Sequence, residues 1–165
     1  MNKKAVISLI ILLLLVIIGL IYINSVYKID SEIPTINSNL NKGNTEFNTG
    51  VSYLNNRQYI EAQKRFNDTL RYYSTARDKT ETALQIAENK EDDVLVEYLN
   101  ATLTEIDYKI NAVNEINEGI NIRDNSSSIA YQHYTNSNNI LKNITQYSDK
   151  RTQLEQAHPE KFLSG

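Results

Sequence analysis

Residues 59–87 read YIEAQKRFNDTLRYYSTARDKTETALQIA, and this stretch decides the fold. Apolar or small side chains recur in it at alternating steps of three and four residues: Tyr59, Ala62, Phe66, Thr69, Tyr73, Ala76, Thr80, Ala83 and Ala87. This spacing places them on one stripe of an α-helix, as in a coiled coil. Charged residues such as Glu61 and Arg65 lie one turn apart on the outer face. We therefore predict a long amphipathic helix here.

Three further segments show helical periodicity. The first is rich in Asn, Thr and Gly, which are poor helix formers, so its helicity must come from packing; its stripe is Ile36, Leu40, Gly43, Phe47, Val51 and Leu54. The segment after residue 93 is the most apolar: Leu95, Leu99, Leu103, Ile106, Ile110, Val113, Ile116 and Ile120. The last stripe is Ala130, Tyr134, Ser137, Leu141, Ile144, Ser148, Arg151 and Leu154.

Caps and turns separate these segments. Asp92 or Asp93 is a suitable N-cap for the third helix, and residues 124–128 form a turn that caps the fourth. No proline occurs between residues 35 and 158, which favours helix over strand. We predict an all-α fold, an antiparallel bundle of about four helices over residues 35–157, with the third helix central. Residues 158–165 are expected to be a flexible tail. On this pattern, Ile110→Asp should unfold the bundle, whereas Lys109→Asp should be nearly silent.

Residues 5–23 read AVISLIILLLLVIIGLIYI and carry no charge. At 1.5 Å per residue this run covers roughly 28 Å, which matches the hydrocarbon core of a bilayer. Lys3 and Lys4 precede the run, so the positive-inside rule keeps residues 1–4 in the cytoplasm. We predict a single transmembrane helix over residues 5–23, a juxtamembrane connector over residues 24–34 and a cell-membrane protein whose C-terminal domain is extracytoplasmic.

Two alternatives concern processing of the N-terminus. A cleaved secretory signal is disfavoured, because the apolar core is long and no Ala-x-Ala site follows it. The sequence from Lys4 and Ala5 into the apolar run resembles the processing site of archaeal type IV pilin-like proteins. That resemblance implies cleavage between Lys4 and Ala5 and packing of the apolar helix into a filament core.

Composition excludes several classes of partner. Without Lys3 and Lys4, 15 of the 17 basic residues remain against 20 acidic residues, a net charge of −5. A mildly acidic chain of this kind argues against nucleic acid as a partner. The sequence contains no cysteine, which removes disulfides, thiolate metal sites and cysteine nucleophiles. Four Asn-x-Ser/Thr sequons, at Asn67, Asn100, Asn125 and Asn143, leave glycosylation open.

Residues 50–66, GVSYLNNRQYIEAQKRF, resemble one helix–turn–helix unit of a tetratricopeptide repeat. The resemblance covers about residues 43–71. It implies that Gly50 and Tyr53 on one helix pack on Ala62 of the next, with Tyr59 and Phe66 filling the gap. Ser74 stands where the family usually has proline, and a shift of about 34 residues reveals no second repeat. The resemblance therefore implies a single repeat-like hairpin, without a peptide-binding groove.

The sequence offers no catalytic, cofactor-binding or metal-binding residues. His133 is interpreted as surface or boundary packing, and Glu155-x-x-His158 is a single pair where a di-iron bundle needs two. Glu91, Asp92 and Asp93 lack calcium-loop spacing and are interpreted as a solvated turn. The eleven tyrosines are assigned to core packing, with a ligand-stacking face as the alternative.

We therefore expect a non-enzymatic, membrane-anchored protein with a binding or scaffolding role. Its contacts would be the bilayer, through residues 5–23, and a protein partner or a second copy of the chain. The alternatives are the pilin-like filament subunit and an extracytoplasmic sensor or accessory module.

Overall fold

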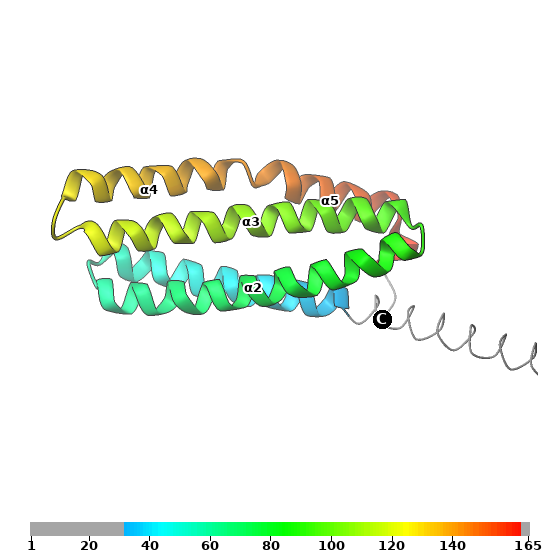
Figure 1. Ribbon diagram of the computed structural model, residues 1–165, viewed down its shortest axis with the longest axis horizontal. Coiled ribbons are helices and arrows are strands. Elements are labelled where there is room, and N and C mark those ends of the chain that lie inside the picture. Colours follow the sequence, from blue (N-terminus) through cyan, green and yellow to red (C-terminus); the bar gives the residue numbers. More distant parts are fainter. Residues whose placement is uncertain (1–31, 163–165) are drawn as a thin grey trace, which may run out of the picture.

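The computed structural model describes residues 32–162, and these form an all-α bundle (Figure 1). Its elements are a helix over residues 32–55, α2 (Tyr59–Asn89), α3 (Asp93–Ile122), α4 (Ser127–Lys142), α5 (Thr145–Ala157) and a short 3₁₀ helix (Pro159–Lys161). Short turns join long helices that run back and forth, while α4 and α5 follow each other along one edge. The predicted all-α bundle is confirmed.

The stripe of α2 is buried as its periodicity predicts. Its buried residues are Ala62, Phe66, Thr69, Tyr73, Ala76, Thr80, Ala83 and Ala87. Small Ala and Thr side chains allow close approach between helices. The Thr hydroxyls cost little to bury, because Thr69 donates to the carbonyl of Arg65 (2.8 Å) and Thr80 to that of Ala76 (2.7 Å).

Helix α3 is central, because it packs against α2, α4 and α5. Leu99, Ile106 and Val113 of its predicted stripe are fully buried. Ile110 is half-buried and packs against the core. The structure also buries residues of α3 that lie beside the predicted stripe: Tyr98, Ala101, Thr102, Glu105, Ala112 and Gly119.

Helix 32–55 is held by close packing of aromatic rings on its glycines. A Cβ atom built on Gly43 would lie 2.4 Å from Cε1 of Tyr73, and one on Gly50 would lie 2.8 Å from Cε1 of Phe66. Neither ring could keep its place against a larger residue. The glycines that weaken the intrinsic helical preference of this segment therefore admit the rings that bury it.

The turns close as their sequences favour. Asp92 caps α3 by accepting a hydrogen bond from the backbone N–H of Leu95 (3.2 Å), and Ser126 caps α4. Arg57 (φ 60°) and Glu91 (φ 55°) take the left-handed conformation that ends the preceding helices.

The fourth predicted segment is divided into α4 and α5. The N–H groups of Asn143 and Ile144 bond to carbonyls three residues back, both at 3.1 Å, instead of four. The side chain of Asn143 donates to the carbonyl of Asn139 (3.3 Å), and that of Gln146 donates to the carbonyl of Asn143 (3.2 Å). These side-chain amides compete with backbone N–H groups for the helix carbonyls, and the backbone here forms a tighter turn with bonds three residues apart.

Residues 158–162, part of the flexible tail expected for residues 158–165, make contacts with the bundle. The Phe162 ring lies 4.7 Å from that of Tyr98, and the Lys161 ammonium lies 2.5 Å from the Asp92 carboxylate. At the other end of the chain, residues 32–34 of the predicted connector are already helical. The predicted transmembrane segment, residues 5–23, lies outside the described residues. No helix within residues 32–162 combines the length and apolar character needed to cross a bilayer.

Candidate binding site between helix 32–55 and the α4–α5 edge

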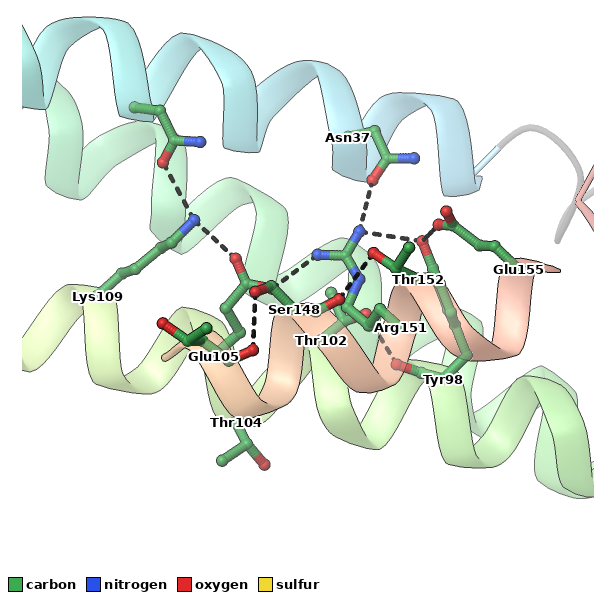
Figure 2. A network of polar contacts seen from close by, with 12 residues as sticks. Asn37, Tyr98, Thr102, Thr104, Glu105, Lys109, Ser148, Arg151, Thr152 and Glu155 are labelled. Carbon is green, nitrogen blue, oxygen red and sulfur yellow. Dashed lines mark hydrogen bonds and ion pairs between the residues drawn. The ribbon is translucent and has the colours of Figure 1, made fainter. Parts of the chain in front are cut away.

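A buried network of charged and polar side chains ties four helices together (Figure 2). Its centre is Glu105 on α3, whose side chain is only 5% exposed. One carboxylate oxygen lies 2.7 Å from the Lys109 ammonium, and the other accepts a hydrogen bond of 2.8 Å from Arg151 on α5. The Lys109 and Arg151 side chains are each 13% exposed. A carboxylate this deeply buried requires such partners.

Arg151 extends the network across the bundle. Its Nη2 donates to Oδ1 of Asn37 (3.1 Å) and to the hydroxyl of Tyr98 (3.0 Å). The Tyr98 hydroxyl in turn donates to Glu155 (2.9 Å). Arg151 therefore joins α5, which has no buried residue of its own, to α3 and to helix 32–55.

At the opposite end, Lys109 reaches helix 32–55. Its ammonium donates to Oδ1 of Asn44 (3.1 Å), which also accepts a hydrogen bond from the Tyr73 hydroxyl (2.8 Å). Lys109 further lies 5.7 Å from the centre of the Tyr73 ring. A single amide oxygen thus connects α2, α3 and helix 32–55.

The network sets the ionisation of its members. Burial alone would raise the pKa of Glu105, but the charges and hydrogen bonds of Lys109 and Arg151 more than offset it, so its pKa lies below the ordinary value of 4.5. Burial raises the pKa of the Tyr73 phenol. Burial also works against the charge of Arg151, yet Tyr98 and Glu105 hold its pKa above the ordinary value. Glu105 and Arg151 are therefore charged at neutral pH.

The position of Lys109 corrects the interpretation of the sequence. Lys109 lies next to the apolar stripe in the sequence, so the pattern predicts an exposed side chain whose change to Asp leaves the stability unaffected. The structure buries most of its side chain and pairs it with Glu105. Sequence periodicity missed Glu105 as well, because a Glu–Lys pair four residues apart is typical of an exposed helix face. One available signal was Arg151, which falls on the predicted stripe of the last segment.

Two adjoining pockets lie between helix 32–55 and the α4–α5 edge, and we call them together the seam groove. The first, of about 370 Å³, is lined by Asn44, Phe47, Asn48, Tyr73, Lys109, Leu141, Ile144, Thr145 and Ser148. The second, of about 490 Å³, is lined by Phe47, Asn48, Val51, Leu54, Asn55, Arg57, Tyr59, Ile116, Tyr134, Ser137, Asn138 and Leu141. Phe47, Asn48 and Leu141 border both pockets, so the two pockets adjoin at these residues.

The wall that α4 contributes holds polar atoms without partners. Ser137 is 2% exposed, and neither its hydroxyl nor that of Tyr134 makes a hydrogen bond within residues 32–162. Gly119 positions the Tyr134 ring, because a Cβ atom there would lie 2.4 Å from Cε1 of Tyr134. Buried hydroxyls without partners are rare in folded proteins and often mark a place where water or a ligand is bound.

The residues singled out for metal chemistry are not brought together. His133 pairs with Glu115 at 2.9 Å, at the contact of α3 and α4. His158 lies 3.6 Å from Glu160, whereas Glu155 bonds to Tyr98 instead. Within residues 32–162, no three His, Asp or Glu side chains group as metal ligands. Asn67, Asn100, Asn125 and Asn143 of the sequons are all exposed.

Comparisons with known proteins add no relationship. No family model, no curated protein and no solved structure matches the chain.

Proposed function

We propose that the protein is a single-pass membrane protein whose helical bundle lies outside the cytoplasm and binds a ligand or partner in the seam groove. The anchor rests on the uncharged run of residues 5–23 and on Lys3 and Lys4 before it. The observation that carries the binding role is the seam groove itself. Each of the two adjoining pockets combines apolar side chains with a similar share of polar ones, so a ligand could find both apolar surface and hydrogen-bond partners there.

The lining of the groove favours binding over catalysis. Among the described residues, those that line the groove and can ionise are Arg57, Tyr59, Tyr73, Lys109 and Tyr134, and no described carboxylate or histidine lines either pocket. General acid–base or nucleophilic chemistry usually needs a group that titrates near neutral pH or an activated nucleophile beside a base. We therefore assign the groove a binding role without a reaction.

The absence of native cysteine permits a direct test of the anchor and its orientation. Thr75→Cys places one thiol on the exposed face of α2, and Asn2→Cys places one before the apolar run. In intact cells, a membrane-impermeant maleimide should label Thr75→Cys, and it should label Asn2→Cys only after permeabilisation. The reverse pattern, or full-length protein that stays in the aqueous fraction, would contradict the proposal. N-terminal sequencing that begins at Ala5 would instead support the filament subunit.

A photo-crosslinking residue tests the binding role in the native membrane. Asn138 lies at the exposed rim of the second pocket, and Thr75 is an exposed position away from both pockets. We expect a cross-linked product from the Asn138 position and none from the Thr75 position. Equal products from both positions, or none from either, would refute a binding role for the groove.

A further inference from the structure

The Lys109 end of the buried network carries more positive than negative charge. Lys109 forms its ion pair with Glu105, and this carboxylate is shared with Arg151. The second carboxylate of the network, Glu155, lies at the opposite end beyond Tyr98 (Figure 2). Lys109 and Arg151 therefore share a single negative charge, at a buried position where solvent weakens electrostatic interactions only slightly.

One of the three N–H groups of Lys109 has no acceptor among the described residues. An ammonium group has three N–H donors. Two of them are directed to Glu105 (2.7 Å) and Asn44 (3.1 Å), and no acceptor among the described residues takes the third. Since Lys109 lines the first pocket of the seam groove, an acceptor for this N–H can approach from that pocket.

The walls of the first pocket suit an anion with an apolar body. Thr145 and Ser148 add hydroxyl-bearing side chains to the same lining as Lys109, the Ser148 hydroxyl donating to the Thr145 carbonyl (3.0 Å), while Phe47, Leu141 and Ile144 supply apolar surface. Since Phe47 and Leu141 continue into the second pocket, a body longer than one ring has apolar surface along its length. A cationic ligand would be repelled by Lys109 in the first pocket and by Arg57 in the second. No carboxylate among the described residues lines either pocket to offset this repulsion.

We infer that the seam groove binds a small organic carboxylate with an aromatic or aliphatic body, with the carboxylate on Lys109 and the body between Phe47 and Leu141. This inference rests on the proposed binding function and names its ligand class. A bound carboxylate would accept a hydrogen bond from the third N–H of Lys109. It would also supply a second negative charge for the two cations, Lys109 and Arg151, that share Glu105. Burial of the apolar body would add the hydrophobic contribution to affinity.

The probe for this site is 2-naphthoate, and the protein is the full chain in lipid nanodiscs. The chain has no Trp and adds no tryptophan fluorescence to that of the naphthalene, and empty nanodiscs provide the background. We expect saturable binding of one naphthoate per chain. The neutral 2-naphthamide should bind at least about tenfold more weakly, which is the order expected for loss of a charged hydrogen bond.

Two variants separate the site from the fold. Lys109→Met removes the ammonium but leaves Glu105 and Arg151 as a one-to-one pair, so we expect the bundle to fold and naphthoate affinity to fall at least about tenfold. Asn48→Phe adds a ring at the rim that both pockets share, without touching the network. It should abolish saturable binding. Asn41→Phe, an exposed position two turns earlier on the same helix and outside both pockets, is the matched control and should bind like the wild type.

Equal affinity for naphthoate and naphthamide, or naphthoate binding that survives both Lys109→Met and Asn48→Phe, would overturn the inference. Absence of saturable binding to the wild type would overturn it as well. These results differ from a failure of the proposed function, because the photo-crosslink from Asn138 can persist when carboxylates do not bind.

Discussion

Arg151 on α5 donates a hydrogen bond of 2.8 Å to Glu105 on α3, and the two residues are 46 positions apart in the chain. Both side chains are largely buried. Helix α5 has no fully buried residue, so this contact contributes to holding α5 against the bundle. The last helix of the bundle is therefore docked by the polar contacts of Arg151 together with partly buried Leu154 and the Tyr147 ring, which stacks on Tyr108 of α3 at 5.6 Å.

Arg151→Ala should destabilise the bundle by about 2–3 kcal/mol, because Glu105, Asn37 and Tyr98 would each lose the charged hydrogen bond that Arg151 donates, while Lys109 stays as the cation of Glu105. Lys150→Ala is the matched control, because the neighbouring Lys150 forms an exposed ion pair with Glu97 at 2.7 Å. An exposed pair of this kind contributes at most about 1 kcal/mol. Urea unfolding of the full chain in mild detergent, followed by circular dichroism, measures both. Similar losses from the two changes would mean that the Arg151 contact is not buried in solution.

The stability should fall with acid in a way that depends on Glu105. Its pKa is lowered in the folded state, so the unfolded chain takes up the proton first as the pH falls. The stabilising contribution is complete above the ordinary value of 4.5 and is lost as the pH falls through the lower folded pKa. Unfolding free energies of the wild type and Glu105→Gln should therefore differ most at neutral pH and converge below pH 4.5. Asp92 and Glu115, whose pKa values are also lowered, titrate in both proteins and cancel in the comparison. Parallel curves would contradict this role of Glu105.

Much of the fold could be predicted from local sequence, because a helix that is buried on one face has apolar residues at every third or fourth position. The stripe from Ala62 to Ala87 on α2 is buried as predicted, and Asp92 caps α3 as its position favours. The division at Asn143 was not predicted, because the apolar spacing continues through Leu141 and Ile144. What interrupts the ladder there is a pair of side-chain amides, Asn143 and Gln146, in a chain where Asn is common.

The candidate site could not be predicted in the same way. The seam groove is formed by residues such as Asn48 and Asn138, which are far apart in sequence and share no periodic pattern. Glu105 and Lys109 have the spacing of an exposed pair, and only Arg151 from another helix makes that spacing a buried network. Such a site depends on how helices are placed relative to one another, which local spacing does not encode.

Gly119→Ala should destabilise the bundle although alanine is the better helix former. The new methyl would lie 2.4 Å from Cε1 of Tyr134, so the ring or the helix must move. We expect a loss of about 1–3 kcal/mol. In a Tyr134→Ala background the clash is absent, and the same change should stabilise by up to about 1 kcal/mol. The double-mutant cycle by urea unfolding tests the contact, and equal effects in both backgrounds would exclude it.

Phe162→Ala should destabilise the bundle by about 1–3 kcal/mol, because Phe162 packs on Tyr98 and on the core. Glu160→Ala is the control two residues earlier, where the side chain is 64% exposed. Thermal unfolding by circular dichroism should show a lower midpoint for Phe162→Ala alone. If the two variants unfold together at the wild-type temperature, residues 158–162 behave as the flexible tail that the sequence predicts.

Lys109→Asp provides the sharpest contrast between the sequence pattern and the structure. The pattern places Lys109 on the outer face and predicts a silent change. In the structure the new carboxylate would replace one of the two cations of buried Glu105 and leave two carboxylates to share Arg151, so we expect a loss of at least about 3 kcal/mol. Lys64→Asp, at an exposed position on α2, is the control and should stay within about 0.5 kcal/mol of the wild type. Urea unfolding of both variants decides between the two faces, because a Lys109→Asp protein as stable as Lys64→Asp would place Lys109 in solvent and remove the charged end of the seam groove.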